Sequence, residues 1–138
     1  MLKTYIKLLL LLLFFKSQSQ GISERKLKDS IQNLRALVQD EEIEISDRIV
    51  SAEKVSKFAK QLDLDSLLLI NNRNLSYLYF TKGYSDKYTQ INFDNLNLAK
   101  KLSDTSGLAT AYFNLGGIYE FIKFKKLIAN TAFSSLPI

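Results

Sequence analysis

The sequence predicts an all-α protein built from stacked antiparallel helical hairpins. Apolar residues recur at spacings of three and four along much of the chain, which is typical of amphipathic helices. One unit of this pattern occurs twice at an offset of 40 residues, as shown by the pairs Ala59 and Ala99, Ser66 and Ser106, Leu68 and Leu108, Asn74-Leu75 and Asn114-Leu115, and Tyr79 and Tyr119. A period of roughly 20 to 50 residues is typical of stacked units, because one unit cannot bury its apolar face alone.

The composition excludes several kinds of chemistry. The 138-residue chain has no cysteine and no histidine, so thiolate chemistry and the commonest general base and metal ligand are missing. Three of its 19 basic residues lie within the first 19 positions, which leaves 16 basic against 14 acidic residues elsewhere. That balance does not give the clustered positive surface expected of a nucleic-acid-binding domain.

Residues 1–19 have the features of a secretory signal peptide. Lys3 and Lys7 precede an apolar run from Leu8 to Phe15, and Ser17 and Ser19 supply small residues for a cleavage site. We expect cleavage between Ser19 and Gln20, and an exported protein that is periplasmic or secreted. The alternative is an uncleaved membrane anchor formed by residues 2–15, although the run is short for a bilayer span of about 20 residues.

Residues 20–58 are predicted to form a first, diverged helical hairpin. A helix is expected from about Glu24 to Gln39, and the acidic segment after it interrupts the pattern. A second helix follows, which Ser46 or Asp47 is expected to cap with a side-chain oxygen. The residues expected to pack together are Leu27, Ile31, Leu34, Val38, Ile45, Ile49, Ala52, Val55, Ala59 and Leu62.

Residues 59–138 are predicted to form the repeat region, and its first clear copy is a helical hairpin. The first helix begins near Asp65, a good N-cap residue, and ends at Lys82-Gly83, where glycine supplies a left-handed backbone. The residues expected to be buried on this helix are Leu68, Asn71 or Asn72, Leu75, Leu78 and Tyr79, followed on the second helix by Tyr84, Tyr88, Ile91, Asn95, Leu98 and Leu102.

The second clear copy begins after Ser103-Asp104-Thr105-Ser106. Its expected core residues are Leu108, Ala111, Tyr112, Leu115, Ile118, Tyr119 and Ile122. Gly116 lies in the middle of this helix, where glycine costs about 1 kcal/mol relative to alanine. We therefore expect another backbone to approach closely at Gly116.

These two copies resemble the tetratricopeptide repeat family, in the variant with a 40-residue period found in exported bacterial proteins. Tyr112, Leu115-Gly116 and Tyr119 match the aromatic, Leu-Gly and Tyr positions of the first helix of that repeat. Asn74-Leu75-Ser76, Tyr79 and Gly83 resemble the same helix and its turn. The resemblance implies a right-handed stack of hairpins whose first helices line a concave, protein-binding surface.

The end of the chain departs from this pattern. After Tyr119 there is no Gly, Asn or Asp where the turn is expected, so either Ala132 and Phe133 belong to a second helix or one longer helix runs through Lys126. No charged residue follows Lys126, whereas repeat arrays normally end in a polar cap. Either the chain is a shortened piece of a longer array, which we favour, or its uncapped end packs against a partner or a second copy in a homodimer.

Two patterns with possible chemistry are better explained structurally. Ser51-Ala-Glu-Lys54 has the Ser-x-x-Lys spacing of serine acylases, but the partner motifs of those enzymes are absent. Asp40, Glu41, Glu42 and Glu44 form an acidic segment without the glycine and spacing of a calcium loop. We therefore expect no enzyme activity, no cofactor and no metal site.

A second stripe lies beside the core stripe on the first helix of each clear copy. It contains Ile70, Arg73, Tyr77, Phe80 and Thr81 in one copy, and Thr110, Phe113, Gly117, Glu120 and Phe121 in the other. If the resemblance holds, both stripes face the concave groove, where aromatic residues and Arg are the usual anchors of protein interfaces. The alternative is burial against a neighbouring helix.

The expected function is therefore non-catalytic binding of a protein or peptide. The candidate binding residues are Arg73, Tyr77, Phe80, Phe113, Asn114 and Phe121, with affinity from the aromatic residues and orientation from Arg73 and Asn114. We expect no nucleic-acid partner, and membrane contact only if the signal segment is uncleaved. The alternative function is a periplasmic sensory fragment of a membrane-bound signalling regulator, either a histidine kinase or a DNA-binding regulator, whose later domains are absent here.

Overall fold

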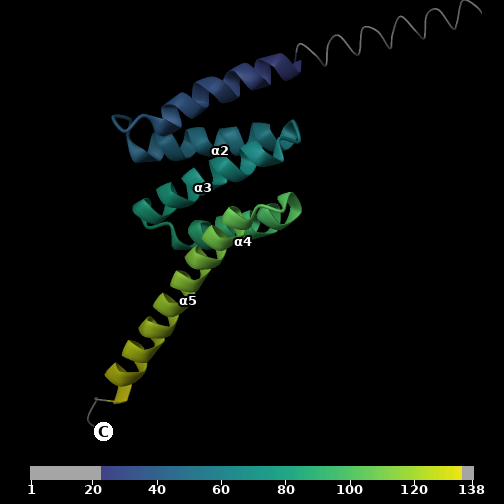
Figure 1. The fold of residues 1–138 in the computed structure, drawn as a ribbon. Coiled ribbons are helices and arrows are strands. Elements are labelled where there is room, and N and C mark those ends of the chain that lie inside the picture. Colours follow the sequence, from purple (N-terminus) through teal and green to yellow (C-terminus); the bar gives the residue numbers. More distant parts are fainter. Residues whose placement is uncertain (1–22, 135–138) are drawn as a thin grey trace, which may run out of the picture. The chain divides into compact units, whose positions relative to one another are not determined.

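The computed structural model describes residues 23–134, and the side chains of residues 23–126. Within this range the chain forms five helices and no strand (Figure 1). They are the helix of residues 23–39, α2 (Ile45–Gln61), α3 (Asp65–Lys82), α4 (Ser85–Leu102) and α5 (Thr105–Ser134). The prediction of an all-α fold of antiparallel helical hairpins is confirmed. The predicted signal peptide lies outside the described residues.

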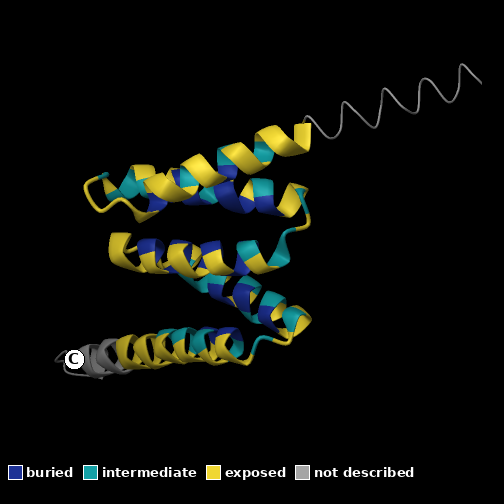
Figure 2. Ribbon diagram, turned by 45° about the horizontal axis from the view of Figure 1, so that its top comes forward, coloured by how far each residue is buried: buried dark blue, intermediate teal, exposed yellow. Residues whose placement is uncertain are grey.

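The chain divides into two compact units, and the boundary between them in the sequence falls between Leu64 and Asp65. In the described part of the first unit, the helix of residues 23–39 and α2 lie side by side and are joined by a short loop (Figures 1 and 2). The predicted boundary after residue 58 falls inside α2. The buried hydrophobic side chains of this hairpin are Ile31, Val38, Ile49, Ala52, Val55 and Ala59, all of which were expected in its core.

The cap of α2 differs from the prediction. Glu44 occupies the N-cap position, and its carboxylate accepts a hydrogen bond from the backbone N–H of Ser46. Ser46 and Asp47 therefore lie inside the first turn. The prediction was wrong because Glu is not among the usual cap residues, but a carboxylate at this position still satisfies a free N–H group and interacts favourably with the helix dipole.

The second unit contains α3, α4 and α5. The helix α4 packs against both α3 and α5, so it is the central helix of the unit. Gly83, with φ of +77°, ends α3 in the left-handed conformation that the sequence predicted. Asp65 is the first residue of α3, and its carboxylate pairs with the ammonium of Lys101 near the end of α4. Asp65 therefore ties α3 to α4, rather than acting as the expected N-cap.

The 40-residue repeat is visible in the backbone of two turns. Asp63 and Ser103 have nearly the same left-handed φ, at 53° and 54°. The next residue in each turn, Leu64 or Asp104, donates a 2.9 Å backbone hydrogen bond to the carbonyl oxygen of Ala59 or Ala99. This is the Schellman arrangement that ends many helices. Both α3 and α5 begin two residues after these left-handed positions.

The helix α5 is one continuous helix of 30 residues. The expected alternative of a turn and a separate helix near Ala132 and Phe133 does not occur. All residues from Tyr119 to Lys126 are exposed (Figure 2), and this half of α5 runs on beyond α3 and α4 (Figure 1). Because α5 has no turn, no described segment that follows residue 118 returns to cover the first half of this helix.

Part of the predicted core of α5 is consequently wrong. Ala111 is buried, and Leu108, Leu115 and Ile118 are half-buried, because this side of the helix lies towards α4. Tyr112, Tyr119 and Ile122 are instead exposed. At Gly116 an added Cβ would meet no atom within 4 Å, so no other backbone approaches there. No helix among the described residues is long and apolar enough to cross a membrane.

Candidate functional site

The second stripe of α3 is exposed along its whole length. Tyr77 keeps 64% of its surface accessible and Phe80 keeps 67%, while Ile70, Arg73 and Thr81 are also exposed. The alternative of burial against a neighbouring helix therefore does not hold for this row. Large aromatic side chains held in an exposed row on a rigid helix are unusual on a monomer surface and are typical of an interaction site.

One aromatic contact supports the α3 row. The ring of Phe80 lies 5.4 Å from the ring of Tyr88 on α4, with the planes tilted by 49°. Tilted ring pairs at this separation are favourable beyond the area they bury. Burial raises the pKa of the Tyr88 phenol above its ordinary value of 10.0, because desolvation disfavours the charged form. Tyr88 thus acts as a neutral support for Phe80.

The second stripe of α5 carries the most exposed aromatic residue of the described chain. Phe113 has 82% of its surface accessible, and Phe121 and Phe124 are exposed on the same helix. The ammonium of Lys125 lies 4.9 Å from the centre of the Phe121 ring, a cation–π contact. Phe124 was missed in the sequence, although it follows Phe121 at a spacing of three and extends the same row.

Asn114 has a different environment from the other candidate residues. Its side-chain nitrogen donates a 2.8 Å hydrogen bond to the side-chain oxygen of Asn92 on α4. The nitrogen of Asn92 in turn donates to the hydroxyl of Ser76 on α3, at 2.8 Å, and to the carbonyl of Tyr88, at 2.7 Å. Asn114 therefore belongs to a polar network that joins α3, α4 and α5.

Asn92 is the centre of that network and was not predicted from the sequence. It is completely buried, and its amide is satisfied on both sides. Its position in α4, beside a core stripe, could have indicated that Asn92 is buried. A polar residue beside such a stripe is, however, normally expected to be exposed. Asn95, one turn later, is also buried, and its side-chain oxygen has no hydrogen-bond partner.

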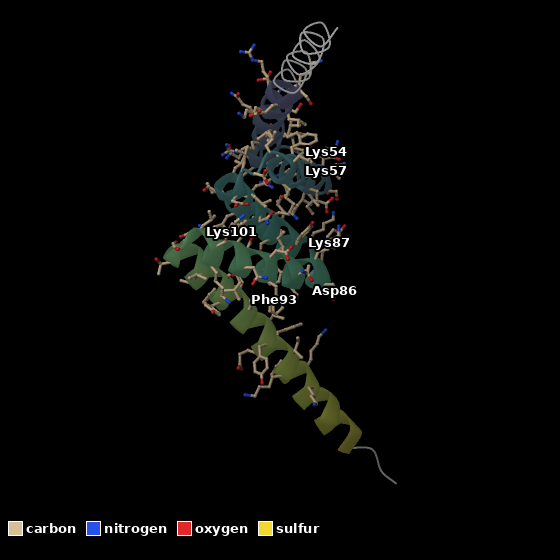
Figure 3. All side chains as sticks on the ribbon, turned by 90° about the vertical axis from the view of Figure 1, so that its right-hand side faces the viewer. Lys54, Lys57, Asp86, Lys87, Phe93 and Lys101 are labelled. Carbon is tan, nitrogen blue, oxygen red and sulfur yellow. The ribbon has the colours of Figure 1, made fainter. Side chains whose placement is uncertain are left out.

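The patterns with possible catalytic or metal chemistry belong to α2 and the loop before it, whereas the aromatic rows belong to α3 and α5. In α2, Ser51 is buried whereas Lys54 is exposed (Figure 3). In the acidic segment, Asp40 accepts a hydrogen bond from the backbone N–H of Glu42, and Glu44 caps α2. Within residues 23–126, no group of three or more acidic side chains is placed to hold a metal ion. The carboxylates of Asp40 and Glu44 thus have structural hydrogen bonds just before and at the start of α2.

Comparison with known proteins assigns no family to the chain. No family model, curated protein or solved structure matches it. A functional interpretation therefore depends on the chemistry of the exposed rows on α3 and α5.

Proposed function

We propose that this chain is an exported, non-catalytic module that binds a protein or peptide through the aromatic rows of α3 and α5. The observation that carries the proposal is the exposure of Tyr77 and Phe80 on α3 and of Phe113 and Phe121 on α5. Truncating such anchors typically costs 2 kcal/mol or more at protein interfaces, about a 30-fold loss of affinity for each.

The arrangement of the helices supports joint use of the two rows. Both α3 and α5 pack on α4, and they run in the same general direction (Figure 1). The 40-residue offset between the two helices is the relation expected of the first helices of successive repeats. The resemblance to tetratricopeptide repeats is part of this proposal, and it would place both rows on one concave surface.

The charge of the rows favours a polypeptide ligand over nucleic acid. Arg73 is the basic residue within the α3 row, and Glu120 lies within the α5 row. A nucleic-acid surface would instead carry several Lys or Arg residues for phosphate contacts. In our proposal Arg73 orients the ligand by pairing with a carboxylate or carbonyl group, while Asn114 is engaged with Asn92.

The proposal of a non-catalytic role depends on the residues that the sequence supplies. Without histidine or cysteine, a reaction would need a nucleophile, a base and an orienting group drawn from other side chains. The exposed rows contain aromatic side chains, one Arg, one Glu and threonines. The hydroxyls of Thr81 and Thr110 donate to carbonyl groups one turn earlier in their own helices.

A peptide-display selection against the purified chain, followed by affinity measurements, tests the binding surface. The double variant Tyr77→Ala, Phe113→Ala should bind selected peptides at least about 30-fold more weakly than the wild type. The matched control is Phe93→Ala, because Phe93 is an aromatic residue of α4 that is half exposed and lies outside both rows (Figure 3). Equal affinity of the wild type and the double variant would exclude this surface.

Export is tested separately by the mass of the protein recovered from outside the cytoplasm. The proposed cleavage predicts a mature chain that begins at Gln20. A fully intact chain in the exported fraction, still starting at Met1, would instead support an anchor formed by residues 2–15.

A further inference from the structure

A second apolar surface lies on α5, beside the core and away from the Phe113 row. It consists of Leu108, Tyr112, Leu115, Tyr119 and Ile122, which we call the α5 seam. Successive members are spaced four, three, four and three residues apart, the pattern that forms the contact line of two-stranded coiled coils. Tyr112, Tyr119 and Ile122 of the seam are exposed, and Leu108 and Leu115 are half-buried.

The corresponding face of α3 is covered within the same chain. Tyr79, the α3 residue that corresponds to Tyr119, is only 6% exposed, whereas Tyr119 is 69% exposed. Tyr79 packs near the ring of Tyr84, at 6.3 Å, and under the ammonium of Lys87, at 5.2 Å. Among the described residues, no side chains cover Tyr119 of the α5 seam as Tyr84 and Lys87 cover Tyr79.

Gly116 shows the same difference between the two copies. Its counterpart on α3 is Ser76, which is buried and accepts a hydrogen bond from Asn92 of α4. At Gly116 the space is open, and the residue brings no side chain of its own. An incoming helix can therefore approach the α5 backbone more closely than α4 approaches α3.

We propose that the α5 seam is covered by the α5 seam of a second copy of this chain, packed antiparallel around a two-fold axis that crosses the seam at the level of residue 117. In this arrangement Tyr112 lies opposite the partner's Ile122, and Leu115 lies opposite the partner's Tyr119. The proposal concerns a different face of α5 from the proposed ligand surface and does not depend on it.

The spacing of four of the five seam residues makes them self-complementary, and Leu108 lies opposite the aliphatic stem of residue 126. A two-fold axis requires that each contact between the two copies occurs twice with the roles exchanged. Tyr112 and Ile122 are equally far from residue 117, and so are Leu115 and Tyr119. Each large aromatic residue thus meets an aliphatic one, and the small residue Gly116 lies near the axis, where the two backbones are closest.

The distribution of charge selects the antiparallel orientation. The segment from Thr105 to Tyr119 contains no charged residue, whereas Lys123, Lys125 and Lys126 follow within the next few positions. A parallel pair would bring these lysines together with their counterparts, and like charges at close range are destabilising. An antiparallel pair lays them beside the uncharged half of the other helix.

The size of the surface predicts a weak dimer. Two tyrosines and an isoleucine that are each more than half exposed, together with two half-buried leucines, bury on the order of 1,000 Å² over both copies. This is near the lower limit for a specific interface. We therefore expect a dissociation constant on the order of micromolar. Monomer and dimer should then both be populated at the protein concentrations used in ordinary solution measurements.

Sedimentation equilibrium of the full chain over a series of concentrations tests the dimer. The wild type should pass from monomer to dimer, whereas Tyr119→Glu should stay monomeric over the same range. Phe113→Glu is the control, because it adds the same charge to α5 on the other face and should dimerise as the wild type does. Far-UV circular dichroism then verifies that both variants keep the helical content. A wild type that stays monomeric, or dimerises equally with Tyr119→Glu, would overturn the proposal.

A matched pair of glycine variants tests the seam without added charge. An added Cβ at either Gly116 or Gly117 meets nothing within 4 Å, so both substitutions fit the single chain. Gly116→Gln places a long side chain at the edge of the seam and should weaken dimerisation at least about tenfold. Gly117→Gln points away from the seam and should leave dimerisation unchanged. Equal effects of the two variants would contradict the proposed face.

Cysteine cross-linking tests the register, since the chain has no cysteine of its own. Tyr112→Cys and Ile122→Cys are prepared as separate proteins and oxidised alone or mixed. The antiparallel register predicts efficient disulfide formation only in the mixture, because residue 112 lies opposite the partner's residue 122. Efficient cross-linking of either variant with itself would contradict the antiparallel register.

Discussion

The side-chain nitrogen of Asn114 on α5 donates a 2.8 Å hydrogen bond to the side-chain oxygen of Asn92 on α4. Because Asn92 also donates to Ser76 on α3, one fully buried amide links three successive helices of the second unit. Hydrogen bonds in a low-dielectric interior strengthen one another and fix the relative position of the groups that they join. This network holds the two helices that carry the aromatic rows.

Replacing Asn92 tests the importance of the network. Asn92→Leu removes the hydrogen bonds to Ser76 and Tyr88 and leaves the half-buried amide of Asn114 without its acceptor. We expect a loss of about 1 to 3 kcal/mol in the free energy of unfolding. Urea unfolding followed by far-UV circular dichroism measures this loss.

The control for Asn92 is Asn95→Leu. Asn95 is also buried on α4, but its side-chain oxygen has no partner, so its removal relieves a desolvation cost. We expect this variant to be as stable as the wild type or more stable. If Asn95→Leu were destabilised as strongly as Asn92→Leu, loss of packing rather than of hydrogen bonds would explain both results.

Two glycines should respond in opposite directions to the same substitution. Gly83 has φ of +77°, a conformation that alanine adopts at a cost of about 1 to 2 kcal/mol. Gly117 lies exposed in α5 with open space at its Cβ position, so Gly117→Ala should stabilise the helix by up to about 1 kcal/mol. Thermal unfolding measures both variants, and a stabilising Gly83→Ala would contradict the turn between α3 and α4.

The raised pKa of the Tyr88 phenol predicts a loss of folding stability at alkaline pH. Because burial raises its pKa in the folded chain, the folded state holds the phenolic proton more tightly than the unfolded state. The stabilising contribution is complete below the unfolded pKa and is lost as pH rises through the raised folded pKa. Stability measured from pH 8 to pH 11 should therefore fall less steeply for Tyr88→Phe than for the wild type. The same slope for both proteins would contradict the partly buried environment of this phenol.

The sequence predicted the helices well because their signals are local. The left-handed turn at Gly83 and the start of α3 near Asp65 follow from the glycine and from the spacing of apolar residues. The buried faces of α2 and α3 follow from the same spacing, as Ala52, Leu75 and Leu78 show.

The errors arise where burial depends on a neighbour that lies elsewhere in the chain. Tyr112 and Tyr119 have the spacing of core residues, but no described helix covers them, because α5 continues straight where a turn was expected. The same missing neighbour leaves Gly116 in open space. In contrast, Asn92 was missed because only tertiary contacts with Ser76 and Asn114 make an amide favourable in the core.

The candidate binding rows were predicted in part. The exposure of Tyr77, Phe80, Phe113 and Phe121 agrees with a surface stripe beside the core stripe, since helical periodicity separates the two faces. The role of Asn114 in the polar network was not predictable, because the partner Asn92 lies 22 residues away in the sequence.

Chemical-shift mapping of the backbone amides during titration with a selected peptide tests the proposed binding surface most directly. The proposal predicts that the largest changes occur around Arg73, Tyr77, Phe113 and Phe121, on both α3 and α5, and that the surroundings of Phe93 remain unchanged. Changes centred on the outer face of α4 around Phe93, with none at Tyr77 or Phe113, would contradict it.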